Sequence, residues 1–380
     1  MNRKLLQPVI GLTLVISFVV GCGAPAATPT PIPPTVTPTP PAAQPTPTPQ
    51  PTKPAAAQGP VHKLIHEEIT SKALASNLVG DPAERGYLVY LPPSYADGNK
   101  RYPVVYILHG FGCDEYDLGL LFEPYEGMLR KGTAQEIILV FPNANNKFGG
   151  SWYRSSPTIG DYETYMAREL VAHIDATYRT IPQRDSRGIT GCSMGGYGAM
   201  HLAMTFPDVY SVAAPMSARY DWTPYSTIEA VAARLTNVPQ NFDDYNQQFF
   251  SMGNILSFYM AIAASAAPNP DKPPFYLDLP FEVVDGKGRI VPEVWKKVTA
   301  ADEPHELEEY LQQPLRLRHI LLYHGAWDPE VPVESARTFD RLLTARGVDH
   351  EYVEVKSGHC NYDMTPVLQY LSDHLAGEQP

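Results

Sequence analysis

The sequence predicts one α/β domain built on a mostly parallel central sheet, and two observations support this. First, short continuous apolar runs, among them Val104–Leu108 and Ile137–Phe141, alternate with helical patterns. A strand that is apolar throughout is buried on both faces, as in a parallel sheet covered by helices. Second, several runs end in turns that contain glycine or polar residues, such as His109-Gly110. Functional groups of open α/β sheets gather at these carboxyl ends of the strands.

The expected elements follow one another along the chain. Six strands are expected over residues 86–91, 104–108, 137–141, 187–191, 320–323 and 352–355, with helices over 162–178 and 194–206. Residues 219–300 interrupt this alternation with a helical stretch of small apolar residues at Met252–Ala267 and a Pro-rich segment after it. We expect a helical insertion here, ahead of the strand at 320–323. Two interpretations stay open for it: a cap over the functional site, or a peripheral helical layer.

Residues 1–22 resemble a bacterial export signal. Arg3 and Lys4 give a positive start, and the apolar run Val9–Val20 is too short for a comfortable membrane span. The run ends in Val-Val-Gly-Cys22, which resembles the lipobox of bacterial lipoproteins and implies a lipid on Cys22. An ordinary signal peptide that ends near a cysteine is the alternative. We therefore expect an exported protein that is lipid-anchored in the bacterial cell envelope.

Residues 23–60 consist mainly of Pro, Thr and Ala and hold almost no large apolar side chains. Such a segment cannot form a core and favours extended polyproline II, which spans on the order of 100 Å at this length. We expect a signal peptide at 1–22, a tether at 23–60 and one catalytic domain at 61–380. The net charge of −12 argues against a nucleic-acid partner, and the oligomeric state stays open.

The segment Gly191-Cys-Ser193-Met-Gly195 carries a G-x-S-x-G motif between an apolar strand and a predicted helix. In this context the serine sits in a tight turn, where flanking side chains would collide with the neighbouring backbone. Serine is weakly nucleophilic and needs a general base. We predict Ser193 as the nucleophile of a serine hydrolase.

The general base is expected downstream of the serine, at the end of a later strand. His359 follows the strand at 352–355 and Gly358, and it is the predicted base. His324 also ends a strand and is the runner-up, although it is expected to shape the loop that holds the acid. His201 lies on the helix after Ser193, where a packed or solvated role is expected.

The acid orients the base and stabilises its charge. Asp328 lies in the turn after the strand at 320–323 and is the predicted acid. Glu330 is the alternative acid, with Glu334 behind it. Glu330 also suits the N-cap of a helix over 332–346.

Acyl transfer needs hydrogen-bond donors for the developing oxyanion. The backbone N–H of Met194, directly after the nucleophile, is one predicted donor. The turn His109-Gly-Phe111-Gly112 supplies the second, and the sequence does not separate Phe111 from Gly112. No cysteine–histidine spacing suggests a metal site, and no metal or other cofactor is expected.

Three cysteines flank the three predicted active-site elements: Cys113, Cys192 and Cys360. The simpler interpretation is that they are small buried apolar fillers. The alternative is a disulfide between two of them, which an exported location would permit.

As an ordered set, five segments resemble the esterase D / putative esterase family. This family includes S-formylglutathione hydrolases, feruloyl and acetyl-xylan-type esterases, and mycolyltransferases. The resemblance runs from about Ser76 to the C-terminus and is weakest over 219–300. The segments are Leu88–Tyr95, Tyr102–Gly110, Gly150–Tyr153, Glu169–Arg179 and Gly191–Gly198.

The resemblance implies an α/β-hydrolase fold and a Ser193–Asp328–His359 triad. Many family members carry an aromatic cluster just after the catalytic histidine, whereas this chain has Cys360-Asn-Tyr-Asp. The predicted function is therefore an exported serine carboxylic ester hydrolase, with a feruloyl- or acetyl-type carbohydrate ester as the expected substrate. An acyltransferase that uses the same triad on an envelope sugar or lipid acceptor is the alternative.

Overall fold

The computed structural model describes residues 63–117, 121–222, 238–252 and 255–377. The predicted signal peptide, the predicted lipidation site Cys22 and the tether lie outside the described residues. Within the described part of the chain, no helix has both the length and the apolar character to cross a membrane.

The central sheet has eight strands in the order β1-β2-β4-β3-β7-β8-β11-β12. The pairs β1–β2 and β2–β4 are antiparallel, and the pairs from β4 to β12 are parallel. This confirms the predicted mostly parallel sheet. The strands are β1 (Lys63–Thr70), β2 (Glu84–Leu91), β3 (Val104–Leu108), β4 (Ile138–Pro142), β7 (Arg187–Cys192), β8 (Val212–Met216), β11 (His319–Gly325) and β12 (Glu351–Val355).

Two strands of this sheet, β1 and β8, lack the apolar signal that predicts the other six. β1 is an edge strand in which Leu64, Ile65 and Ile69 are interspersed among charged and polar residues, and its described side chains are at least partly exposed. β8 is fully buried but has the sequence Val-Ala-Ala-Pro-Met, and proline is unfavourable inside a strand. Neither strand therefore shows the long run of large apolar side chains that marks β3 or β4.

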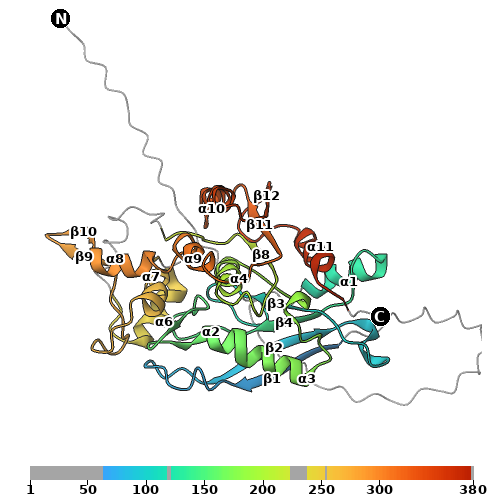
Figure 1. Cartoon of the computed structure of the whole chain (residues 1–380). Coiled ribbons are helices and arrows are strands. Elements are labelled where there is room, and N and C mark those ends of the chain that lie inside the picture. The colour runs from blue at the N-terminus through green and yellow to red at the C-terminus, as the bar shows by residue number, and fades with distance from the viewer. Residues whose placement is uncertain (1–62, 118–120, 223–237, 253–254, 378–380) are drawn as a thin grey trace, which may run out of the picture.

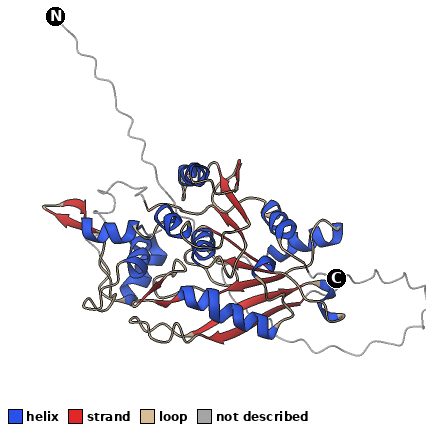
Figure 2. Ribbon diagram, in the orientation of Figure 1, coloured by secondary structure: helices blue, strands red, loops and turns tan. Residues whose placement is uncertain are grey.

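The side chains of β3 show how the sheet is covered on both faces. Val104, Tyr106 and Leu108 lie in one buried cluster together with residues of α3 (Leu170–Thr177) and α4 (Met194–Thr205). Val105 and Ile107 lie in a second buried cluster with residues of α1 (Phe122–Lys131) and α11 (Thr365–His374). Figure 2 shows the strands with helices on both sides. This two-sided burial is the physical reason that β3 is apolar throughout.

Both expected helices are present. The helix expected over 162–178 consists of α2 (Tyr162–Thr164), a π-helical turn (η3, Tyr165–Glu169) and α3. The helix expected after the serine is α4. The remaining elements are η1 (Pro93–Ala96), β5 (Ser155–Ser156), β6 (Gly160–Asp161), η4 (Arg184–Ser186), α9 (Glu303–Tyr310) and α10 (Val333–Ala345), besides those of the insertion.

The insertion contains α6 (Phe242–Met252), α7 (Ile255–Ala266), the hairpin β9 (Phe281–Val284) and β10 (Lys287–Ile290), and α8 (Pro292–Thr299). In Figure 1 these elements gather at the end of the molecule away from α1 and α11. The Phe258 ring of α7 lies 6.0 Å from the Phe111 ring and 5.0 Å from the Trp152 ring. The insertion therefore packs beside the turns at the strand ends, which favours the cap interpretation over a detached peripheral layer.

Candidate active site

Ser193 sits in the turn between β7 and α4 with a backbone conformation that few non-glycine residues adopt, φ 61° and ψ −119°. The glycines on either side make this turn possible. A Cβ on Gly195 would lie 2.0 Å from the carbonyl oxygen of Leu108, and a Cβ on Gly191 would lie 2.5 Å from the same atom. The turn thus requires small residues at both positions, as the motif predicts. A strained backbone at this point is characteristic of a functional turn.

His359 and Asp328 lie side by side, although 31 positions separate them in the chain. The imidazole Nδ1 is 2.7 Å from the carboxylate Oδ2, where it donates a hydrogen bond. The other carboxylate oxygen accepts hydrogen bonds from the backbone N–H groups of Glu330 and Val331, at 2.9 and 2.8 Å. Burial raises the pKa of Asp328, but His359 and these two donors outweigh it and hold the pKa below its usual value. Asp328 is therefore held as a charged acceptor that fixes the orientation of His359.

The alternative acids occupy other positions. The nearer carboxylate oxygen of Glu330 lies 3.7 Å from Nε2 of His359, the nitrogen opposite to the one that Asp328 contacts. Glu330 does not cap a helix either, because α10 begins at Val333 with Pro332 as its N-cap and without a side-chain cap. Glu334 is paired with Arg337 at 3.0 Å on the surface. Asp328 is thus the carboxylate placed to orient His359, the predicted base. The N-cap interpretation of Glu330 is wrong.

The other two histidines that the sequence singled out have structural partners. His324 is buried, and its Nε2 donates to the carbonyl of Val331 at 2.9 Å, in the turn that follows Asp328. Burial lowers the pKa of His324, so the ring is held neutral in this turn. His201 is buried between Glu163 and Glu306, at 3.0 and 2.9 Å. Both agree with the packing roles expected for them.

A disulfide joins Cys192 to Cys360, with 6.1 Å between their Cα atoms. The first cysteine directly precedes Ser193 and the second directly follows His359. Because neighbouring Cα atoms are about 3.8 Å apart, the Cα atoms of Ser193 and His359 are at most about 14 Å apart. The filler interpretation is wrong for these two cysteines, and Cys113 is not part of this pair.

The predicted oxyanion turn lies against Ser193, the predicted nucleophile. A Cβ built on Gly110 would be 3.9 Å from the Cβ of Ser193. The N–H of Gly112 donates to the carbonyl of Gly149 at 2.7 Å, so this donor is already used within the fold. The structure therefore favours Phe111 over Gly112 as the partner of Met194 in an oxyanion site.

The loop at 149–153 supports this turn, and the sequence pattern did not assign it a role. Trp152 and Tyr153 both have positive φ, at 55° and 57°. The Tyr153 hydroxyl donates to the carbonyl of His109 at 3.0 Å, and the Trp152 ring packs on Phe111. These two residues belong to the Gly-Ser-Trp-Tyr segment that carries the family resemblance. The sequence therefore marked this segment, but it did not show that the segment supports the predicted oxyanion turn.

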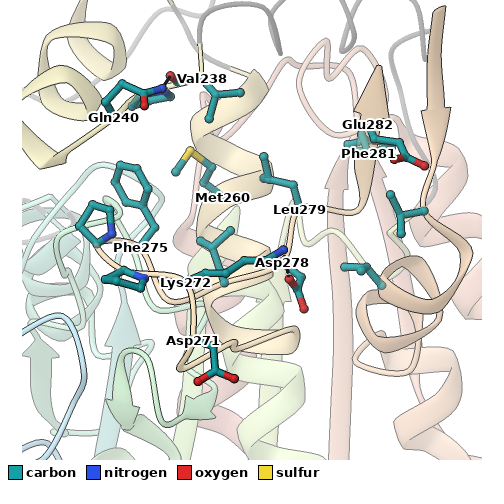
Figure 3. A pocket seen from close by; sticks show the side chains of 16 residues that line it. Val238, Gln240, Met260, Asp271, Lys272, Phe275, Asp278, Leu279, Phe281 and Glu282 are labelled. Atoms are coloured by element: carbon teal, nitrogen blue, oxygen red, sulfur yellow. Dashed lines mark hydrogen bonds and ion pairs between the residues drawn. The ribbon is translucent and has the colours of Figure 1, made fainter. Parts of the chain in front are cut away.

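A cavity of about 850 Å³ is lined entirely by the insertion, between Val238 and Val294 (Figure 3). Its apolar wall includes Met260 and Phe275, while the Lys272 and Asp278 side chains pair with each other at 2.6 Å. Ser193, Asp328 and His359 do not line it. This cavity is therefore separate from the candidate active site.

Comparison with known proteins gives the family and several relatives. The model of the family described as "putative esterase" matches residues 82–363. An esterase of Mycobacterium tuberculosis (strain H37Rv) is 33% identical over 147 residues, which cover 36% of this chain and 30% of the relative. The S-formylglutathione hydrolase of Paracoccus denitrificans is 28% identical over 171 residues, covering 36% of this chain and 54% of the relative. The chain thus spans a third to about half of these curated relatives.

Solved structures show the same fold over more of the chain. A ferulic acid esterase aligns with a TM-score of 0.52 at 21% identity, covering 83% of this chain and 99% of its own. An S-formylglutathione hydrolase of Staphylococcus aureus aligns with a TM-score of 0.52 at 16% identity, covering 82% and 99%. At these identities the likeness shows the fold alone, and it confirms the expected α/β-hydrolase architecture.

Proposed function

Because the chain belongs to the putative esterase family, we propose that it is a carboxylic ester hydrolase that works through an acyl-enzyme at Ser193. The observation that carries this proposal is the 2.7 Å contact between His359 Nδ1 and Asp328 Oδ2, with Ser193 tethered nearby in a strained turn. The contact orients the imidazole so that its other nitrogen, Nε2, is left to act as a base.

The proposed reaction has two balanced halves. The Ser193 hydroxyl oxygen attacks the ester carbonyl carbon while its proton passes to Nε2 of His359. The oxyanion receives hydrogen bonds from the N–H groups of Met194 and Phe111. The tetrahedral intermediate then expels the alcohol, which takes the proton from Nε2. Water repeats the sequence on the acyl-enzyme, and this step releases the acid and restores Ser193.

The proposed substrate is a feruloyl- or acetyl-type ester of a carbohydrate. A solved structure of the same fold is a ferulic acid esterase, which supports this choice. An acyltransferase that uses the same triad would need a dry, apolar tunnel for its acyl group, and the apolar stretch Met252–Ala267 is the place to look for one. The described side chains Met260, Ala263 and Ala264 of this stretch are buried in the main core cluster. Met260 also lines the cavity of the insertion, but Ser193, Asp328 and His359 do not, so this cavity does not support an acyl tunnel at Ser193.

The proposed location is the bacterial cell envelope, outside the cytoplasm, where a lipid on Cys22 would anchor the exported protein. The support for it is the sequence pattern of residues 1–22, which lie outside the described residues. We expect the parent protein to fractionate with membranes and Cys22→Ser to become soluble. A Cys22→Ser protein that still fractionates with membranes would contradict the lipid anchor.

The test of the mechanism is Ser193→Ala, assayed with p-nitrophenyl acetate. We expect its kcat to fall by at least about 10³-fold, because the nucleophile is lost. Ser76→Ala is the matched control, since Ser76 is exposed and lies far from Ser193 in the chain. It should keep the parental rate, and both variants should keep the parental melting temperature. A near-parental rate in Ser193→Ala would refute the acyl-enzyme.

A further inference from the structure

Glu330 places a carboxylate beside the reacting nitrogen of the proposed base. Its Oε2 is 3.7 Å from Nε2 of His359, while Asp328 occupies the opposite nitrogen. The Glu330 side chain is 28% exposed, so it is partly buried and still reachable by a ligand. The backbone of Glu330 is fixed, because its N–H donates to Asp328 Oδ1 at 2.9 Å.

The fold itself does not use this carboxylate. Glu330 does not cap α10, and among the residues that the structure describes no side chain or N–H donates a hydrogen bond to it. Burial raises the pKa of Glu330; the charge of His359 lowers it, and the charge of Asp328 raises it. A partly buried carboxylate without a hydrogen-bond donor carries a desolvation cost, and the charge of His359 offsets this cost only in part. The position of such a carboxylate is better explained by a role in binding a ligand than by a contribution to the stability of the fold.

Asp117, another carboxylate near Ser193, differs from Glu330 because it accepts a hydrogen bond within the fold. Asp117 Oδ2 accepts a hydrogen bond from the N–H of Gly110 at 3.3 Å, on the oxyanion side of the site. Asp117 thus has a partner in the fold, whereas Glu330 presents open acceptor oxygens next to His359.

The position of Glu330 determines which half of the substrate it meets. In the proposed reaction, Nε2 of His359 returns its proton to the departing alcohol oxygen, so a group beside Nε2 faces the alcohol half of the ester. A carboxylate accepts hydrogen bonds from hydroxyl groups and repels anions. We propose that Glu330 determines alcohol specificity: it binds a hydroxyl next to the ester oxygen, favours neutral polyhydroxylated alcohols and rejects anionic ones. This inference rests on the proposed function and deepens it.

The experiment uses three esters that share one acyl group, chosen as the one that the parent cleaves fastest from a p-nitrophenyl panel. The alcohols are glycerol (esterified at position 1), 1-propanol and 3-hydroxypropanoate. For the parent, we expect kcat/KM for the glycerol ester to exceed that for the propyl ester by at least roughly tenfold, the lower end of the range for a hydrogen bond to a charged group. The anionic ester should be slower than the propyl ester.

Two substitutions of Glu330 distinguish the effect of its hydrogen-bond acceptor from the effect of its negative charge. Glu330→Leu removes both, so the ratio of kcat/KM for the glycerol ester to that for the propyl ester should fall to about one. Glu330→Gln removes only the charge and should raise the relative rate of the anionic ester by severalfold. Glu334→Gln, an exposed carboxylate four residues later that pairs with Arg337, is the matched control and should change none of the ratios.

The possible outcomes distinguish a failure of the specificity role of Glu330 from a failure of the proposed function. Equal changes for all three esters in the Glu330 variants, or a parent without preference for glycerol, would overturn the specificity role of Glu330 and leave the proposed function intact. Loss of all activity in Glu330→Leu, the p-nitrophenyl ester included, would also overturn it, since Glu330 would then act on the chemistry itself. Full activity in Ser193→Ala would instead remove the proposed function.

Discussion

Removing the Cys192–Cys360 disulfide tests how the proposed nucleophile and base are held together. The substitution Cys192→Ala/Cys360→Ala opens a cross-link between residues 168 positions apart. In the chain-entropy model, a loop of this length corresponds to about 5 kcal/mol of stabilisation, as an upper value. A whole domain is stable by only about 5–15 kcal/mol, so the loss should be large.

The same change should reduce activity without removing any reacting group. The cystine connects the residue before Ser193 to the residue after His359, and Cys360 itself has a positive φ of 49°. Without the cross-link, the loop that carries His359 is held by backbone contacts such as that between Trp327 N and Ser357 O at 3.0 Å. A shift of about 1 Å in a catalytic group costs on the order of 10²-fold in rate. We therefore expect a fall in kcat of between about 10- and 100-fold.

Two measurements check this prediction. Urea unfolding gives the loss of stability, and p-nitrophenyl ester hydrolysis gives kcat, each for the parent and for the double alanine variant. A reductant should bring the parent towards the kcat of the variant. A double variant with the parental urea midpoint and the parental kcat would refute the positioning role of the disulfide.

Two further predictions concern the nucleophile turn and a buried ion pair. Gly195→Ala should destabilise the protein by at least about 2 kcal/mol in urea unfolding, because the added Cβ would lie 2.0 Å from the carbonyl oxygen of Leu108. Gly127→Ala, in α1 with only a flexible arginine tip 3.8 Å away, is the control and should be neutral or stabilising; equal losses in both would contradict the steric argument. Burial raises the pKa of Glu163, but the hydrogen bond and charge of His201 outweigh it and lower the pKa to about 2. A lowered pKa stabilises the fold above the unfolded value and the effect is lost as pH falls, so Glu163→Gln should be less stable than the parent at pH 6 and the difference should shrink between about pH 4.5 and pH 2. A difference that stays constant over this range would count against the ion pair.

The nucleophile turn was predictable because its chemistry is local. Ser193 lies between Gly191 and Gly195, and the structure shows that a Cβ at either glycine would strike the Leu108 carbonyl. The strand before the turn, β7, is fully buried because helices cover the sheet on both faces. Both constraints act on residues that are close in sequence, so the pattern itself carries them.

The sequence pattern did not decide between Asp328 and Glu330 as the predicted acid. It also did not decide between Phe111 and Gly112 as the predicted second oxyanion donor. Asp328 and Glu330 are two residues apart in one turn, and their roles differ only in which nitrogen of His359 they approach. Phe111 and Gly112 are adjacent, and only the contact of Gly112 N–H with the Gly149 carbonyl separates them. In each case the deciding partner lies far away in the chain.

The sequence by itself determined the α/β class, the strand-to-helix turn at Ser193 and the candidate positions for the base and acid, because burial and steric exclusion act on neighbouring residues. Tertiary structure alone decided that Cys192 pairs with Cys360, that Asp328 orients His359, and that Glu330 stands at Nε2. Those facts depend on distances between β7, β11 and the loop after β12, which the folding of the sheet sets and no spacing along the chain records.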